Sequence, residues 1–207
     1  MSMTATIETV LSQENLLEAM ESFEGKRDNR GVDGVKLSEL EEYWEANGEK
    51  IKKTILQGEY SLGYVKQQEI MNAKGKKRTI SLMNTVDRFI YRALMQVLAK
   101  EWTPQFSEYS YAYQDHKGIK QAVEQAAEYM EKGYIWCVEL DIQNFFDNIN
   151  HDILLQKVKK VISDKRIIDL IIAYMNCTVV DDHLYYRREK GILQGGPVSP
   201  LLSNIYM

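Results

Sequence analysis

The first residues that could do chemistry lie in the segment Leu140-Asp-Ile-Gln-Asn-Phe-Phe-Asp147. Asp141 ends a run of aromatic and β-branched residues, 134–140, that is typical of a buried strand. A carboxylate in such a place needs hydrogen bonds or a cation, and Mg²⁺ takes one or two protein carboxylates together with phosphate oxygens and water. Asp141 is therefore either a candidate metal ligand or the cap of the next turn. Asp147 is expected to be structural.

A second candidate is the loop Gly191-Ile-Leu-Gln-Gly-Gly-Pro-Val-Ser-Pro200. Paired glycines let a backbone approach a ligand closely, and the side chain of Gln194 can both donate and accept hydrogen bonds toward a phosphate or a base. The plainer interpretation is a tight turn between a strand and a helix. The spacing alone leaves both interpretations open.

A third candidate is a basic hairpin tip that carries Lys74, Lys76 and Lys77 and continues into Arg78. The guanidinium fork of Arg78 can grip a phosphate at two points. A solvated hairpin tip that binds nothing would explain the three lysines equally well.

The distribution of charge matters more here than the total. The formal net charge of −4 counts against a nucleic-acid binder when it is averaged over the surface. From Lys66 to Lys100, however, eight basic and two acidic residues give 8 − 2 = +6. We expect this stretch to be able to face phosphates.

Composition and cysteine usage indicate an ordinary globular protein, with 44% hydrophobic and 27% charged residues. The first thirty residues are acidic and contain no apolar block, so we expect no signal peptide, no membrane span and a cytoplasmic location.

Cys137 and Cys177 form no CxxC pair and the chain has only three histidines. Both cysteines are expected to be core thiols, and no zinc site is expected.

Hydrophobic periodicity and turn residues predict the elements that must position these candidates. A helix starting at Asn84 or Thr85 is the most strongly amphipathic, with either residue as its cap. Ser199 or Ser203 could cap the last helix. The predicted helices are 7–23, 37–47, 49–57, 85–100, 118–132, 151–161, 164–176 and one from 201; a hairpin joins 64–71 to 77–82, a strand covers 134–141, and 178–188 is extended.

Taken in order, these segments resemble the successive blocks of group II intron reverse transcriptases, over roughly residues 31–207. The last two blocks are the most specific, and the order carries more weight than any single match. The matching blocks are Gly31-Val-Asp-Gly34, Gly75-Lys-Lys-Arg78 with Thr85-Val-Asp-Arg88, Phe106-Ser-Glu-Tyr-Ser-Tyr-Ala-Tyr113, Asp141-Ile-Gln-Asn-Phe-Phe-Asp147 with His151, and Gln194-Gly-Gly-Pro-Val-Ser-Pro200.

The resemblance implies roles for individual residues. Asp141 and the backbone carbonyl of Ile142 would be ligands in a site for two Mg²⁺ ions. Phe146 would stack under the sugar and select dNTPs over rNTPs, whereas Phe145 fills the core. Arg78 would contact the incoming triphosphate, and Gln194 would line the nucleotide pocket.

Two departures from the family pattern affect basic contacts. The lysine that the family places after an Ile-Pro pair is absent, since Ile70-Met71-Asn72 stands there. We expect Lys76 or Lys74 to substitute for it at the nucleotide. The usual Gly-Phe-Arg run is replaced by Ala112-Tyr113-Gln114, which removes one basic contact. The residues expected to bind RNA are Lys74, Lys77, Arg88 and Arg92.

The resemblance also implies a fold and a division of the chain. The fold is α+β, a right-hand polymerase fingers subdomain with an incomplete palm, mostly helical with a fingers β-hairpin and a small antiparallel palm sheet. The expected regions are an N-terminal helical extension and loop at 1–33, fingers at 34–132 and partial palm at 133–207.

The implied activity is RNA-directed DNA synthesis by an intron-encoded maturase that also binds intron RNA and assists splicing and retrohoming. The implied partners are template and intron RNA, a DNA primer and dNTPs, with a homodimer as a further candidate and no membrane. The family's Tyr-Ala-Asp-Asp hairpin is expected beyond Met207, so this chain alone is expected not to polymerise. The alternatives are an RNA-binding splicing lobe without polymerase activity, a scaffolding lobe, and a retron or diversity-generating reverse transcriptase.

Overall fold

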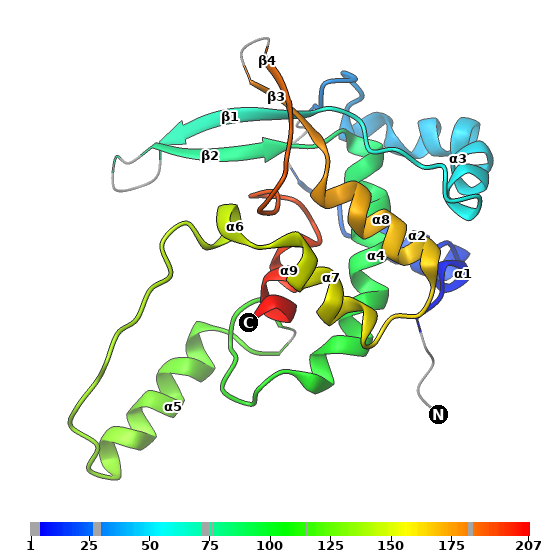
Figure 1. Ribbon diagram of the computed structural model, residues 1–207. Coiled ribbons are helices and arrows are strands. Elements are labelled where there is room, and N and C mark those ends of the chain that lie inside the picture. Colours follow the sequence, from blue (N-terminus) through cyan, green and yellow to red (C-terminus); the bar gives the residue numbers. More distant parts are fainter. Residues whose placement is uncertain (1–4, 27–29, 72–74, 76, 115, 182–183) are drawn as a thin grey trace.

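The computed structural model describes residues 5–26, 30–71, 75, 77–114, 116–181 and 184–207 (Figure 1). The side chain of Arg78 is not among the described parts. The elements are the helices α1 Ile7–Val10, α2 Gln13–Glu21, α3 Leu40–Leu56, α4 Thr85–Trp102, α5 Ile119–Glu131, α6 Phe145–Asn148, α7 His151–Lys159, α8 Lys165–Met175 and α9 Ser199–Tyr206, the 3₁₀ helices η1 Leu37–Glu39 and η2 Thr103–Gln105, and the strands β1 Val65–Met71, β2 Lys77–Leu82, β3 Thr178–Asp181 and β4 Leu184–Arg187.

Helix α4 lies at the centre of the core, and α1, α2, α3 and α9 pack against it. Its predicted apolar stripe is buried, as expected for a helix with one core-facing side. Trp44 of α3 meets Phe89 edge to face, with ring centroids 4.8 Å apart. The hydroxyl of Tyr91 donates to the backbone carbonyl of Leu170 in α8 at 2.8 Å. The central helix thus joins the N-terminal helices to α8.

The strands form one sheet in the order β2-β1-β3-β4. The predicted hairpin is confirmed, with β1 and β2 antiparallel and Lys66 opposite Leu82. β1 also pairs in parallel with β3, where Val65 lies opposite Val179 and both are fully buried. The segment predicted only as extended chain at 178–188 therefore continues the sheet of the β1–β2 hairpin, with β4 at its edge (Figure 1).

Two predicted helix limits are wrong. The helix predicted at 7–23 breaks before Ser12, whose side chain accepts a hydrogen bond from the N–H of Asn15 and starts α2. The break predicted at Gly48 does not occur, and α3 continues to Leu56. A Cβ on Gly48 would lie 2.9 Å from Cε2 of Trp44, so this glycine allows a close contact inside the helix.

The caps also differ in detail. Asn84 is the N-cap of α4 by position, but its side chain makes no capping bond to the helix. Its Oδ1 instead accepts from the backbone N–H of Val32 at 2.9 Å and holds the glycine-bounded loop against α4. The cap of α9 is Val198, and neither predicted serine serves; Ser199 is the first residue of the helix.

The strand predicted at 134–141 does not form. Trp136 and Leu140 expose 89% and 90% of their surface, and α5 before them contains no buried residue. A strand needs a neighbour to satisfy its backbone hydrogen-bonding groups, and no described strand pairs with this segment. Cys137 lies on it and is exposed, so its prediction as a core thiol is wrong, whereas Cys177 is buried as predicted.

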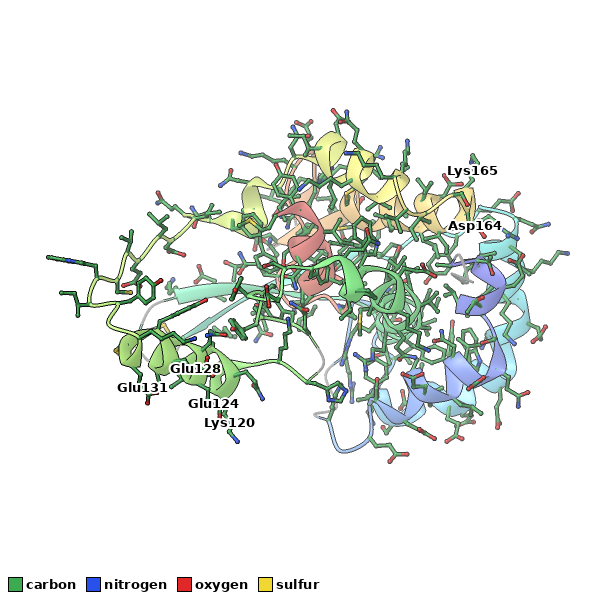
Figure 2. All side chains as sticks on the ribbon, turned by 90° about the horizontal axis from the view of Figure 1, so that it is seen from below. Lys120, Glu124, Glu128, Glu131, Asp164 and Lys165 are labelled. Atoms are coloured by element: carbon green, nitrogen blue, oxygen red, sulfur yellow. The ribbon has the colours of Figure 1, made fainter. Side chains whose placement is uncertain are left out.

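Helix α5 and the chain that follows it stand apart from the body of the protein (Figure 1). Charged side chains along α5 lie far from those at the start of α8; Figure 2 labels Lys120, Glu124, Glu128 and Glu131 on α5, and Asp164 and Lys165 at α8. The mostly helical α+β architecture with a small sheet agrees with the fold class expected from the sequence. The separate antiparallel palm sheet of that expectation does not form among the described residues, because β3 pairs in parallel with β1 and so joins β4 to the hairpin in one mixed sheet. Among the described residues, no helix is long and apolar enough to cross a membrane.

Candidate functional site

A polar pocket of about 370 Å³ lies between the β1–β2 hairpin, the start of α6 and the glycine-rich loop before α9. Its walls carry amides, hydroxyls and charged groups and little apolar surface. Such walls suit a polar ligand, because their groups can donate and accept hydrogen bonds. The lining residues are Gln67, Lys77, Thr79, Ser81, Asn144, Asp147, Arg188 and Gln194.

The hairpin wall of the pocket comes from alternate residues of β2. Lys77, Thr79 and Ser81 share one face of the strand because side chains alternate along it. The backbone N–H of Ser81 donates to the carbonyl of Gln194 at 2.8 Å. This bond fastens the glycine-rich loop to the end of the hairpin. Lys77 is exposed and forms an ion pair of 2.7 Å with Glu69.

The opposite wall contains a chain of polar contacts. Nε2 of Gln194 donates to Oδ2 of Asp147 at 3.0 Å. The other carboxylate oxygen of Asp147 lies 3.5 Å from Nη2 of Arg188. Asp147, expected to be structural, therefore lines the pocket and links a buried cation to the side chain of Gln194.

The glycine-rich loop is held against α6 and α7 by short bonds. The N–H of Ile192 donates to the carbonyl of Phe146 at 2.8 Å, and the N–H of Gly191 donates to that of Ile149 at 2.7 Å. The ring nitrogen Nε2 of His151 lies 2.7 Å from the carbonyl oxygen of Gly191. Gly191 has φ +77° and a Cβ there would lie 2.7 Å from the carbonyl oxygen of Asp147, so glycine is required.

The floor beneath the loop is packed around Tyr174. Its hydroxyl and that of Ser199 are hydrogen-bonded at 2.6 Å, and Ser199 also donates to the carbonyl of Leu193 at 2.6 Å. Burial raises the pKa of the Tyr174 phenol well above its usual range, so the phenol stays neutral. A Cβ on Gly196 would lie 1.7 Å from the Tyr174 hydroxyl oxygen. Gly196 is thus a packing requirement of the floor.

Asp141 and Ile142, the predicted metal ligands, do not line this pocket. Both are exposed on the segment that follows α5. In the described part of the chain, no three His, Cys, Asp or Glu side chains gather as a metal site. One exposed carboxylate does not fit a two-ion centre.

The other predicted nucleotide residues divide into two groups. Gln194 lines the pocket, and Phe146 is half-buried beside it in α6, edge to face with Phe145 at 6.0 Å. Arg78 lies in β2 opposite Ile70, with its side chain outside the described parts. Lys74 and Lys76 lie outside the described residues altogether.

The predicted RNA-binding residues of α4 lie one helical turn apart and form a cationic cluster with Lys26. Burial and then the charges of Arg92 and Arg88 lower the pKa of Lys26, and burial lowers the pKa of Arg88. The ring of Phe23 lies beneath both Lys26 and Arg88, at 5.2 and 5.4 Å from its centroid. The fourth predicted RNA-binding residue, Lys77, lies in the polar pocket instead.

The sequence motifs gave no site role to five residues that line the pocket, which are Gln67, Thr79, Ser81, Asn144 and Arg188. Thr79 could have been found from the period of two along β2. Asn144 has a left-handed backbone with φ 50°, which asparagine tolerates better than most residues. Nothing in the sequence distinguishes Arg188 from its neighbour Arg187, because only the fold buries one and exposes the other.

Comparisons with known proteins point to one family. The sequence profile described as "Reverse transcriptase (RNA-dependent DNA polymerase)" matches residues 65–207. The chain is 28% identical to Protein YkfC of Escherichia coli over 181 residues, 86% of this chain and 48% of that protein. It is 30% identical to the group II intron-encoded protein LtrA of Lactococcus lactis over 163 residues, 77% of this chain and 27% of that protein.

A putative COX1/OXI3 intron 2 protein of Saccharomyces cerevisiae is 27% identical over 86% of this chain and 20% of its own length. The chain thus spans at most about half the length of these relatives. Among solved structures, a chain of a partial Cas6-RT-Cas1–Cas2 complex superposes with a TM-score of 0.59 at 17% identity, over 96% of this chain and 33% of that one. That likeness shows the fold alone.

Proposed function

The chain belongs to the reverse transcriptase (RNA-dependent DNA polymerase) family, and we propose that it forms the fingers and first part of the palm of a group II intron-type enzyme. In this proposal the polar pocket beneath the hairpin receives the incoming deoxynucleotide. The observation that carries it is the meeting of hairpin, α6 and glycine-rich loop around one pocket of about 370 Å³.

Roles follow for the residues around the pocket. Gln194 contacts the nucleotide from the loop, and Phe146 lies under the sugar and disfavours a 2′-hydroxyl. Arg78 and Lys76 bind the triphosphate in this proposal. The boundaries proposed for the regions remain residues 1–33, 34–132 and 133–207.

Family members use divalent metal ions, and we propose Mg²⁺ with Asp141 and the carbonyl of Ile142 among its ligands. When bound, such ions stabilise the charge that develops on transferring phosphates. The described residues supply too few carboxylates for this centre. We therefore expect the chain alone to give no primer extension on an RNA template with dNTPs, and measurable extension would contradict this expectation.

Template or intron RNA is proposed to lie along the cluster of Lys26, Arg88 and Arg92, with Lys74 and Lys77 contributing from the hairpin. A cationic cluster suits a nucleic-acid backbone, because its charges can neutralise phosphates. Cytoplasmic location and the homodimer remain proposals of the same kind.

Salt-dependent RNA binding tests this face. The double variant Arg88→Gln with Arg92→Gln removes two of the proposed phosphate contacts, so the slope of log affinity against log salt should become shallower by about 2. The matched control is Lys120→Gln with Lys132→Gln, which removes two exposed charges, one from α5 and one from its C-cap. Equal slopes for the unchanged chain and the Arg88/Arg92 variant, or equal losses in both variants, would contradict the proposal.

A further inference from the structure

We propose that Arg188 is a positioning residue, which fixes Asp147 so that Asp147 orients the side-chain amide of Gln194 in the pocket. The inference rests on the proposed function of the pocket. It adds a residue from the end of β4 that lies outside the motif blocks.

The side chain of Arg188 is largely buried and does not lie on the protein surface. Its side chain is 9% exposed, and its backbone N–H donates to the carbonyl of Cys177 at 3.3 Å. Its buried Nε has no hydrogen-bond partner among the described residues. A buried guanidinium is costly unless a carboxylate compensates it. Asp147 is the carboxylate that pairs with it in the described part of the chain.

Glycine at 191 makes room for this pair. A Cβ at Gly191 would lie 2.8 Å from Nη2 of Arg188 and 2.7 Å from the carbonyl oxygen of Asp147. Any larger residue would push both groups away. The loop that carries Gln194 is therefore shaped around the guanidinium and the backbone of Asp147.

The carboxylate of Asp147 contacts Arg188 with one oxygen and Gln194 with the other, so it connects the two side chains. The side chain of Asp147 is 48% exposed, so without Arg188 the carboxylate would be free to turn toward water. With Arg188 on one oxygen, the other accepts from Nε2 of Gln194 at 3.0 Å. A glutamine amide can present either its oxygen or its nitrogen, and its hydrogen-bond partner decides which.

This arrangement sets what Gln194 can recognise. Because Asp147 accepts from Nε2, it fixes on which side of the amide the acceptor Oε1 lies, and Nε2 carries a second N–H that Asp147 does not use. Phosphate oxygens only accept, so Oε1 suits a hydroxyl or an N–H of the sugar or base and not a phosphate. In this proposal Arg188, acting through Asp147, determines where Gln194 places its acceptor and its remaining N–H, without touching the nucleotide itself.

The test uses the side-chain amide signals of Gln194 in ¹⁵N-labelled chain, first without ligand. Arg188→Gln should shift these signals toward those of a solvated glutamine, and Arg188→Lys should restore part of the shift because it keeps the charge. The control Arg187→Gln removes the neighbouring exposed charge and should leave the signals in place. Unmoved Gln194 signals in the folded Arg188→Gln variant would overturn the proposal.

Asp147→Asn keeps the test decisive if Arg188→Gln does not fold, because residue 147 is half exposed. It should move the Gln194 signals in the same direction, and unmoved signals would overturn the proposal. Titration with dTTP then gives the functional arm, where Arg188→Gln should weaken binding by about tenfold, the effect of one misplaced hydrogen bond. Weaker binding with unmoved Gln194 signals would mean direct contact and would also overturn it. No dTTP binding by the unchanged chain would count against the proposed function, while the ligand-free spectra still decide the role of Arg188.

Discussion

The contact between Gly196 and Tyr174 allows the packing of the pocket floor to be tested quantitatively. In Gly196→Ala the new Cβ would lie 1.7 Å from the hydroxyl oxygen and 2.8 Å from Cζ of Tyr174. The fully buried ring cannot simply move away, since Tyr91 lies against it at 4.9 Å and Ser199 holds its hydroxyl. Overpacking costs about 1–3 kcal/mol and the strained hydrogen bond about 1 kcal/mol more.

We therefore expect Gly196→Ala to lower the free energy of unfolding by about 2–4 kcal/mol, measured by urea unfolding followed by circular dichroism. For a chain of this size the melting temperature should fall by about 4–16 °C. Gly118→Ala is the matched control, because the nearest atom to its Cβ is Oε1 of Gln121 at 3.7 Å. It should change stability by less than about 0.5 kcal/mol.

A double-mutant cycle isolates the cause. Tyr174→Phe removes the atom that overlaps most with the new Cβ, so Gly196→Ala should cost at least about 1 kcal/mol less in that background. Strict additivity of the two substitutions would refute the reasoning. It would show that alanine is accommodated by movement of the loop rather than resisted by the tyrosine.

Further predictions follow from which side chains are buried and which are exposed. Burial raises the pKa of Asp87 to about 6, so the folded chain holds a proton that the unfolded chain releases, and stability should decrease as pH rises from about 4 to above 6. Tyr60→Phe removes a hydrogen-bond donor to the Asp87 carboxylate, so it should lower the free energy of unfolding by about 1.5–3 kcal/mol at pH 8 and by less at pH 5. The same loss at both pH values, measured by urea unfolding, would contradict this expectation. Trp136 should be quenched freely by iodide, and its protection would mean that segment 134–142 is covered. The exposed thiol of Cys137 should react with a thiol reagent at once. The buried thiol of Cys177, whose pKa burial raises to about 11, should react only when the chain unfolds. Rapid reaction of both cysteines in the folded chain would contradict the burial of Cys177.

The elements that depend on local pattern were predictable from the sequence. Helix α4, predicted at 85–100 and observed at Thr85–Trp102, was found almost to its limits because its apolar residues recur at helical spacing. The hairpin β1–β2 was also predictable, since a Gly-containing turn separates two extended runs. The loop that carries Gln194 was predictable from its glycines and prolines, whereas a place for Gln194 at a pocket was implied only by the family resemblance.

The rest depends on neighbours that one sequence does not display. The run 134–141 has strong β propensity, but propensity becomes a strand only when a partner strand supplies hydrogen bonds. Gly48 looked like a helix end, and only the position of Trp44 shows that it is a close contact. Arg187 and Arg188 are adjacent and chemically identical, so only tertiary burial separates the surface cation from the positioning one.

The parallel pairing of β1 with β3 has a consequence for how the chain folds during synthesis. The β1–β2 hairpin is local and can close as soon as residue 82 has been made. Its other edge waits for residues 178–181, which leave the ribosome much later. Until then the backbone groups at the start of β1 remain without their sheet partner, and pairing so distant in sequence is slow because a long loop must close first. The hairpin is therefore the first part of the sheet to form, but its free edge acquires a partner strand only after β3 has been made.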